Sequence, residues 1–361
     1  MLSLIIGDTH FGSKSDNAAM LDYSLSYFER VVYPLVKERK IERIVHLGDF
    51  YDRRKYANFA TLSAVRKSVI EPLSDLGVPV DIIAGNHDTY WRNASDVTSL
   101  EEVIGGKYPN IKFHIEPSSI DVGFRKPSLL LPWINSSNND ASLEAIAAAP
   151  KGTMVFSHLE LNGFDVLPGV KFAGGMDPST FSNLRVISGH FHHKQDAGNI
   201  IYVGTPYDLN FGDRMSTKGV HVLNSSENTL EFIPNDDKMF HQYVYDDRSD
   251  GFLVDQRTGA QVSPSSAVGK YLRIVVHAKT NPNLFDRVYG EASSSAGTLS
   301  VVEVLPTDDA PEKEAVADMS KGTIELIHDA IEGMDNIPDK DRLKRFMSEL
   351  YVESISRDSA A

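Results

Sequence analysis

The stretch Leu2-Ser3-Leu4-Ile5-Ile6-Gly7-Asp8-Thr9-His10 is an apolar run that ends in a carboxylate and an imidazole. A short run of this composition predicts a buried β-strand. Gly7 allows the backbone to turn tightly where the strand ends. We therefore expect Asp8 and His10 to lie just beyond the carboxyl end of a strand, which is where open α/β folds build their ligand sites.

The same pattern recurs four times along the chain. Apolar runs precede Gly48-Asp49, Gly85-Asn86-His87-Asp88, Ser157-His158 and Gly189-His190-Phe191-His192. A single histidine after a strand is more often a structural hydrogen-bonding residue than a ligand. Five such segments in one context favour a metal site, and their carboxylate, amide and imidazole donors suit Mn, Fe or Zn.

Two ions that share one carboxylate form a binuclear centre of the kind that hydrolyses phosphoesters. Asp49 is assigned as the bridge because it is central among the motifs. The predicted ligands are Asp8, His10 and His192 for one ion, Asn86, His158 and His190 for the other, and Asp49 for both.

His87 lies beside a predicted ligand and is not needed as one. It is therefore the candidate general acid that protonates the leaving oxygen. The alternative is that His87 orients a neighbouring ligand. Asp88 is expected to orient His87 or a ligand instead of binding metal.

These motifs resemble the calcineurin-like metallophosphoesterase superfamily. Within it they are most similar to the DNA repair nucleases: bacterial SbcD, the meiotic recombination (Mre-eleven) nucleases, and the T-even phage recombination nuclease subunit. Gly85-Asn86-His87-Asp88 is the usual form in that branch, whereas Ser/Thr protein phosphatases usually carry Glu in the last place. Residues 48–52 and 201–207 also resemble the corresponding segments of these nucleases, and the resemblance covers residues 1 to about 225.

The resemblance implies a four-layered α/β/β/α sandwich with a small α+β capping domain and a C-terminal helix pair. It also implies two divalent metal ions, Mn²⁺ by expectation and Mg²⁺ as the alternative. The expected domains are a nuclease domain at 1–235, a capping, DNA-orienting domain at 236–305, and a linker with a helical ATPase-binding segment at 306–361.

The expected activity is that of a Mn-dependent DNA exo/endonuclease, the catalytic subunit of an SbcCD-like complex that processes DNA ends for recombination and repair. The partners implied are DNA, an SbcC-type ABC ATPase with a coiled coil, and a second copy of the chain in a 2:2 complex. Either the helix at 58–76 or the one at 95–104 could supply the self-contact.

One position departs from the family pattern. Archaeal and eukaryotic members usually carry a second active-site histidine three residues after the bridging aspartate, where this chain has Asp52. We therefore expect His87 to be the single obvious acid and Asp52 to act on a ligand or on substrate.

Two other functions share the same motifs. A metallophosphoesterase that acts on small phosphodiesters or phosphoproteins would use the same ligands, but it would need neither a capping module nor a C-terminal helix pair. A scaffold that has lost catalysis is disfavoured, because every ligand position is filled.

The net charge is the feature that agrees least well with DNA binding. The chain carries a formal charge of −14 at pH 7, whereas phosphate contacts normally supply most of the non-specific affinity for DNA. Metal ions could neutralise the acidic centre, a partner could hold the DNA, or local residues could contact it. The candidates for local contact are Arg53 and Arg54, with Lys55, and Trp91 and Arg92. A solvated loop is the alternative for the basic run.

Composition excludes several classes. The 361-residue chain has no cysteine, which excludes disulfides and thiolate chemistry. No stretch approaches the ~20 apolar residues of a membrane span, and the short apolar run before Asp8 predicts a strand in place of a signal peptide. We expect a cytoplasmic protein without membrane association, in a bacterial cytoplasm or a phage-infected cell.

Periodicity predicts the remaining elements. Helices are expected at 18–38, 58–76, 95–104, 140–149 and 283–289, followed by a turn at 293–297. Strands are expected near 111–115, 128–132, 200–204, 219–223, 229–233, 271–277 and 299–305. The strands near 200–204, 219–223 and 229–233 are close together in the sequence, which is consistent with antiparallel additions. Two amphipathic helices are predicted at roughly 312–332 and from Pro338 onward, either docked on the core of the chain itself or lying on a partner.

Overall fold

The computed structural model describes residues 1–167, 170–304, 331–332, 339–340, 342–344 and 346–347. Residues 1–166 and 172–305 form one compact unit, and residues 167–171 and 306–361 are assigned to a second. The predicted C-terminal helix pair lies mostly outside the described residues, so it stays a prediction.

Two six-stranded sheets form the centre of the first unit. The first has the order β16-β15-β1-β2-β3-β6, with the bounds β1 Leu2–Ile6, β2 Arg43–His46, β3 Val80–Ile83, β6 Ile111–His114, β15 Lys218–Asn224 and β16 Thr229–Asn235. Its strands β1, β2, β3 and β6 are parallel, and β15 and β16 are added antiparallel. The antiparallel additions predicted near 219–223 and 229–233 are thereby confirmed.

The second sheet has the order β13-β14-β12-β9-β8-β7. Its strands are β7 Ser118–Ile120, β8 Ser128–Leu131, β9 Met154–His158, β12 Arg185–Gly189, β13 Gln195–Asp196 and β14 Ile200–Tyr202. The four central strands are parallel. The predicted antiparallel addition near 200–204 is wrong, because β14 runs parallel to β12 and only β13 turns back along it.

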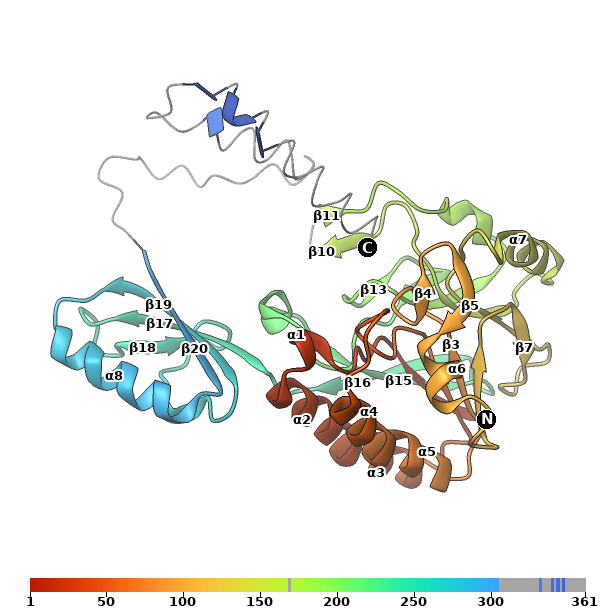
Figure 1. Ribbon diagram of the computed structural model, residues 1–361, viewed down its shortest axis with the longest axis horizontal. Helices are drawn as coiled ribbons and strands as arrows, with labels where there is room; N and C mark the ends of the chain where they lie inside the picture. The colour runs from red at the N-terminus through yellow and green to blue at the C-terminus, as the bar shows by residue number, and fades with distance from the viewer. Residues whose placement is uncertain (168–169, 305–330, 333–338, 341, 345, 348–361) are drawn as a thin grey trace. The chain divides into compact units, whose positions relative to one another are not determined.

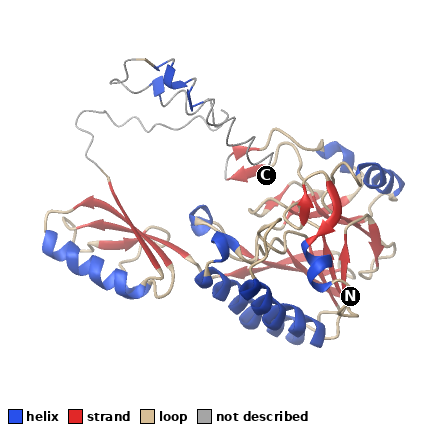
Figure 2. Ribbon diagram, viewed as in Figure 1, coloured by secondary structure: helices blue, strands red, loops and turns tan. Residues whose placement is uncertain are grey.

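Helices cover the outer face of each sheet (Figure 1). The first sheet is covered by α2 (Ala18–Tyr27), which continues through Phe28–Val32 into α3 (Tyr33–Glu38), and by α4 (Phe59–Val65), which continues through Arg66–Ile70 into α5 (Glu71–Asp75). The second sheet carries α7 (Asn139–Ala148). Figure 2 shows both sheets lying between these helices.

The alternation of side chains along β1 explains the layering, because successive residues of a strand face opposite sides. Leu4 and Ile6 pack into the core formed with the helices, whereas Ile5 packs into a second core with Phe156 of the other sheet. A third core packs Ile146 of α7 against the outer face of the second sheet. The predicted α/β/β/α sandwich is confirmed.

The segment predicted as a helix at 95–104 is wrong in its first half. Ala94–Thr98 is strand β5, which pairs with β4 (Thr89–Trp91), and only Ser99–Ile104 forms helix α6. β-branched Val97 and Thr98 favour an extended backbone, and the partner strand makes that preference decisive.

A third sheet, β18-β17-β19-β20, follows the sandwich. It comprises β17 (Phe240–Asp246), β18 (Leu253–Asp255), β19 (Tyr271–Ala278) and β20 (Thr298–Glu303), and α8 (Pro282–Ser295) packs on it. The turn predicted at 293–297 is wrong, because Ser294 and Ser295 are helical and their hydroxyls donate to the carbonyls of Gly290 and Glu291. The boundary at 235/236 and the capping role stay predictions.

The described chain also contains α1 (Ser13–Asp16), the strand pair β10 (Asp165–Leu167) and β11 (Val170–Lys171), and short 3₁₀ helices at Pro178–Phe181, Phe211–Met215 and Pro264–Ser266. Among the described helices, none has the length and apolar character that a membrane crossing requires.

Candidate metal centre

The carboxyl ends of the parallel strands of both sheets meet at one place. The imidazole Nδ1 of His158, at the end of β9, lies 2.7 Å from the carbonyl of Leu47 after β2. The backbone amide of His190, after β12, donates to the carboxylate of Asp8, after β1, at 3.0 Å. The two sheets therefore bring their loops together across the inter-sheet core.

The loops that carry the predicted ligands have an unusual backbone. His10, Asp49 and His190 have φ values of 45°, 51° and 91°, in the left-handed region that non-glycine residues rarely adopt. A residue held in such a conformation costs on the order of 1 kcal/mol or more and is found mostly at functional sites. A Cβ at Gly85 would lie 2.2 Å from Asp49 Oδ1, so only glycine fits beside the carboxylate of Asp49.

The first predicted ligand group is assembled. His10 Nε2 and His192 Nε2 face each other at 3.1 Å, and His192 Nε2 lies 3.9 Å from Asp8 Oδ2. The ligand atoms of Asp8, His10 and His192 all lie within 4.8 Å of one another. Asp8 and His10 are buried, and His192 is half-buried.

The second group is also assembled. Asn86 Oδ1 lies 3.0 Å from His158 Nε2 and 2.9 Å from His190 Nδ1. Asp49 lies between the groups, because its Oδ2 is 3.6 Å from His10 Nε2 and 3.5 Å from His158 Nε2. All seven predicted ligands thus converge, and their roles as ligands stay predictions.

The donor set fits divalent cations. Three carboxylate or amide side chains and four imidazoles converge in a buried pocket, with two imidazole nitrogens directed at each other. Burial alone would lower the pKa of His10, but the neighbouring carboxylates of Asp52, Asp49 and Asp8 raise it to about 9. For His158, burial is likewise outweighed by Asp49 and Asp8, which raise its pKa to about 9. The centre therefore attracts positive charge strongly.

Asp52 contacts the two histidines that matter most for the predicted chemistry. Its carboxylate Oδ1 lies 3.3 Å from His10 Nδ1, and its backbone carbonyl lies 2.6 Å from His87 Nδ1. A carboxylate on the far nitrogen of a metal-binding histidine fixes the ring and makes it a better donor. Asp52, which occupies the position of the second histidine in the family pattern, therefore orients His10 of the first predicted ligand group.

His87 lies at the edge of the same cluster. Its ring centroid is 4.8 Å from that of His10, and a ring nitrogen lies within 4.8 Å of ligand atoms of His10 and Asp49. Because Nδ1 faces the Asp52 carbonyl, Nε2 is the nitrogen left to act on a substrate. Burial and the charge of His10 lower the pKa of His87 against the opposing effect of Asp49.

Asp88 contacts the backbone of two of the loops that carry predicted ligands. Its Oδ1 accepts from the amide of Phe50 at 3.0 Å, and its Oδ2 accepts from the amide of Gly85 at 2.9 Å. Burial, together with the charge of Asp49, raises its pKa to about 7. Asp88 thus ties the loop of Asp49 to the loop of Asn86, and it positions ligands through the backbone.

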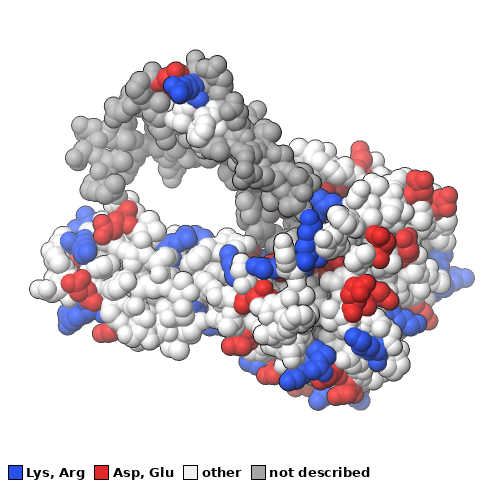
Figure 3. All heavy atoms as spheres, viewed as in Figure 1, with Lys and Arg blue, Asp and Glu red and all other residues white. Residues whose placement is uncertain are grey.

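The predicted substrate contacts Arg53, Arg54, Trp91 and Arg92 are all at least partly exposed. Arg53 is 39% exposed and lies 3.6 Å from Asp16. Arg54 is half-buried, and burial together with the charge of Arg92 lowers its pKa. Trp91 is 48% exposed. On the face shown in Figure 3, acidic and basic side chains are interspersed, so any attraction for a polyanion on that face is local.

Sequence reasoning missed three supporting residues. Lys218 is 2% exposed, and its Nζ donates to the His192 carbonyl at 2.7 Å and lies 2.7 Å from Asp213. Trp133 packs its ring 5.5 Å from that of His190, and Glu160 Oε1 lies 3.5 Å from His190 Nε2. Trp133 follows β8 as the ligands follow their strands, so the same sheet-edge reasoning could have found it. No local signal marks Lys218.

Comparison with known proteins agrees with the fold. The calcineurin-like phosphoesterase family matches residues 1–256, and the chain belongs to that family. Exonuclease subunit 1 of Enterobacteria phage T4 is 27% identical over 358 residues, which cover 98% of this chain and 99% of that protein.

Two further proteins show weaker similarity. The DNA double-strand break repair protein Mre11 of Sulfurisphaera tokodaii is 26% identical over 224 residues, 57% of this chain and 54% of that protein. Among solved structures, GAP50, the anchor in the inner membrane complex of Plasmodium, aligns with a TM-score of 0.37 at 13% identity over 66% of this chain and 90% of that one. That last likeness is too low to carry an argument.

Proposed function

We propose that this protein is a Mn-dependent DNA nuclease, with exo- or endonuclease activity, that hydrolyses phosphodiesters at a two-metal centre. The observation that carries the proposal is the position of Asp49, whose one carboxylate oxygen lies within 3.6 Å of a nitrogen from each ligand group. Similarity to a phage exonuclease subunit over 98% of the chain supports DNA as the substrate.

Each group in the centre has a defined task. A pair of divalent ions, when bound, supplies Lewis-acid activation of the phosphodiester and of the attacking water. The seven ligands hold those ions, and Asp52 orients His10 and His87. His87, when it is protonated on both ring nitrogens, would donate the Nε2 proton to the leaving oxygen, because the Asp52 carbonyl accepts from Nδ1–H and keeps that proton in place.

The wider assembly is part of the proposal. The protein is inferred to act as the catalytic subunit of a complex that processes DNA ends, with an SbcC-type ATPase bound by the segment 306–361 and a second nuclease copy. The self-contact is assigned to the helices α4–α5, within 58–76, or to α6. The module formed by β17–β20 and α8 is proposed to orient DNA, and the expected location is a bacterial cytoplasm or a phage-infected cell.

The test is release of nucleotides from linear duplex DNA by the purified protein in Mn²⁺. Asp49→Asn removes the bridging charge with little change of shape, and Asp196→Asn, an exposed carboxylate on β13, is the matched control. We expect the wild type and Asp196→Asn to release nucleotides and Asp49→Asn or chelation to abolish release. Thermal melting checks that both variants fold.

The alternative function is separated in the same assay. Acidic metal sites of this kind also hydrolyse small phosphodiesters, so bis(p-nitrophenyl) phosphate is included as a second substrate. If the wild type and the reconstituted ATPase complex hydrolyse that substrate but release nothing from DNA, the nuclease proposal is wrong and a small-molecule or phosphoprotein phosphoesterase takes its place.

A further inference from the structure

A cavity of about 340 Å³ lies at the edge of the second sheet that is opposite the metal centre. Its walls come from the loop before β8, the amino ends of β9 and β12, and the turn between β15 and β16. The predicted ligands His158 and His190 lie at or just beyond the carboxyl ends of β9 and β12. Because β9 has five residues, the cavity is on the order of 15 Å from the centre. It shares no residue with the predicted ligand set.

The cavity is lined by four basic side chains and no acidic one. Arg125 and Lys126 come from the loop before β8, whereas Lys151 precedes β9 and Arg185 begins β12. None of the four forms an ion pair with a carboxylate among the residues that the structure describes. The whole chain has 50 acidic and 36 basic residues, so this acid-free group runs against the average composition. A concave surface lined by charges of one sign concentrates ions of the opposite sign, here anions.

Neutral groups hold two of these cations in place. Lys126 Nζ donates to the backbone carbonyl of Lys151 at 3.3 Å, and the guanidinium of Arg185 donates to Asn228 Oδ1. Arg185 is half-buried, and a charge that is withdrawn from water is normally paired with an opposite charge. The amide oxygen of Asn228 cannot neutralise a guanidinium. Arg185 therefore provides a second and separate indication of an anion in the cavity.

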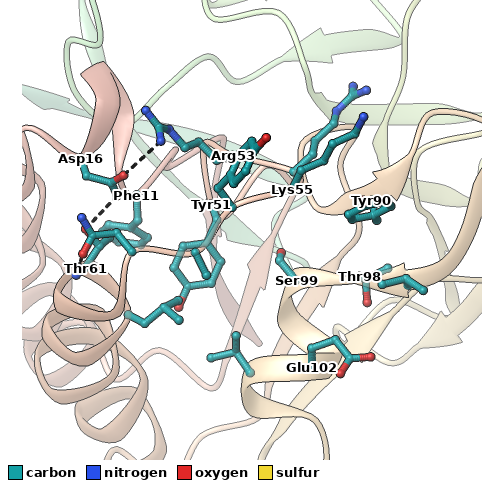
Figure 4. A pocket seen from close by; sticks show the side chains of 17 residues that line it. Phe11, Asp16, Tyr51, Arg53, Lys55, Thr61, Tyr90, Thr98, Ser99 and Glu102 are labelled. Carbon is teal, nitrogen blue, oxygen red and sulfur yellow. Dashed lines mark hydrogen bonds and ion pairs between the residues drawn. The ribbon is translucent and has the colours of Figure 1, made fainter. Parts of the chain in front are cut away.

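Another cavity of the described chain, of about 200 Å³, lacks this property (Figure 4). Arg53 and Lys55 line it, but Asp16 and Glu102 line it as well, and Asp16 lies 3.6 Å from Arg53. Its walls also include parts of α4 and α6, the helices assigned above to the self-contact. Mixed charges of this kind neutralise one another and need no ligand, whereas the acid-free cavity has no such compensation.

The lining residues favour phosphate over other anions. The guanidinium groups of Arg125 and Arg185 present planar forks of donors that match phosphate oxygens. Four cations exceed what one carboxylate can neutralise. The hydroxyls of Thr153 and Ser225 already donate to backbone carbonyls at 2.7 and 3.2 Å, and the aromatic ring in the lining, Phe124, is half-buried. The cavity therefore offers charge for phosphate but little for the base of a nucleotide.

We propose that this cavity binds phosphate groups that together carry at least two negative charges, at a site separate from the metal centre. Arg185 would contact the anion from the wall, and Arg125, Lys126 and Lys151 would contact it from the exposed rim. Two sources supply this chemistry, adjacent phosphates of a DNA backbone and a free polyphosphate anion. The proposal goes beyond the nuclease function and does not depend on it, because the two sites share no residue.

The test uses the full-length protein stripped of metal, in a buffer without phosphate, so that no cleavage intervenes. Lys126→Gln and Lys151→Gln each remove one exposed charge, and Arg185→Gln removes the half-buried one, whereas Arg185→Lys keeps it. The matched control is Lys37→Gln, which removes an exposed charge on α3 that has no ion pair among the described residues. Thermal melting checks that each variant folds, and the two variants at exposed lysines keep the test valid if Arg185→Gln does not.

The first probe is inorganic pyrophosphate, measured by calorimetry. We expect each Lys→Gln variant and Arg185→Gln to weaken its binding at least about threefold, the size of one exposed ion pair. Arg185→Lys should weaken binding less than Arg185→Gln does, and Lys37→Gln should bind as the wild type does. If the wild type does not bind pyrophosphate, or if the cavity variants bind it as Lys37→Gln does, the proposal is wrong.

The second probe is labelled linear duplex DNA, measured by fluorescence anisotropy at several salt concentrations, and it identifies the source of the phosphate. If the source is a DNA backbone, each cavity variant should also weaken duplex binding and reduce the slope of log affinity against log salt by about one. If duplex binding and its slope stay at the values of Lys37→Gln while pyrophosphate binding is weakened, the source is a free polyphosphate anion. Both results support a phosphate site.

Two other occupants are separated by further measurements. If an oligoglutamate binds as tightly as pyrophosphate and depends on Lys126 and Arg185, the cavity takes an acidic protein segment. If the cavity variants change the sedimentation coefficient and leave pyrophosphate binding unchanged, the surface is an interface between copies of this chain. Either result overturns the phosphate site. Because none of these measurements involves cleavage, failure of the nuclease assay described above leaves this proposal standing.

Discussion

Metal loading should release protons from the centre, and the number can be measured. Histidine binds metal only through a neutral nitrogen, so a ligand that is protonated in the metal-free protein must lose its proton. His10 and His158 have an ordinary pKa of 6.5, and the surrounding carboxylates raise both values to about 9. Between pH 7 and 8 both rings are therefore charged before metal binds.

The magnitude follows from these two pKa values. Two protons released per binding event make the apparent metal affinity rise about a hundredfold for each pH unit between 7 and 8, which corresponds to about 3 kcal/mol per unit. Calorimetry in buffers of different ionisation enthalpy counts the protons directly. Asp52→Asn removes the carboxylate 3.3 Å from His10 Nδ1 and should reduce the count by up to one proton, whereas Asp196→Asn should not change it.

The same shifts predict the pH dependence of the metal-free fold. A folded-state pKa above the unfolded value contributes stability that is fully present below pH 6.5 and lost as pH rises through about 9. The loss is at most about 3 kcal/mol for each imidazole. The melting temperature in chelator should therefore fall as the pH rises from 6.5 to 9. Over the same range, the rise in melting temperature that Mn²⁺ produces should become larger. Release of less than half a proton at pH 7.5 would refute the reasoning.

Two further substitutions test single residues. His87→Ala should keep metal binding, measured by calorimetry, and reduce the rate of DNA cleavage about 10²–10⁴-fold, the usual contribution of a general acid. Cleavage at the wild-type rate would remove His87 from the mechanism. Loss of metal binding would show that His87 is a ligand. Lys218→Met leaves Asp213 charged and 1% exposed without its cationic partner, while its Oδ2 still accepts from the amides of Leu209 and Asn210. Chemical denaturation should therefore show a loss of about 3–5 kcal/mol in the free energy of unfolding. The double variant with Asp213→Asn, which removes the charge and keeps an acceptor oxygen, should recover part of that loss, and an equally unstable double variant would show that the ion pair is not the cause.

The sequence by itself determined most of the elements and the candidate donors of the centre. Five apolar runs each ended in a carboxylate, amide or imidazole, and both features are local, since composition predicts a strand and the next residues supply the ligand chemistry. The long helices at 18–38 and 58–76 were predictable for the same reason, because their apolar period is read within one segment.

The tertiary structure alone decided which residues support the ligands. Asp52 and His10 are in contact although they are 42 residues apart in the sequence, and Lys218 donates to the His192 carbonyl from 26 residues away. No short window of sequence therefore contains either pair. The β4–β5 hairpin replaced half of a predicted helix because its hydrogen bonds come from a partner strand. The local sequence pattern specifies which donor side chains are available. Long-range packing decides which residues contact those side chains, and these contacts set the protonation and the orientation of each donor.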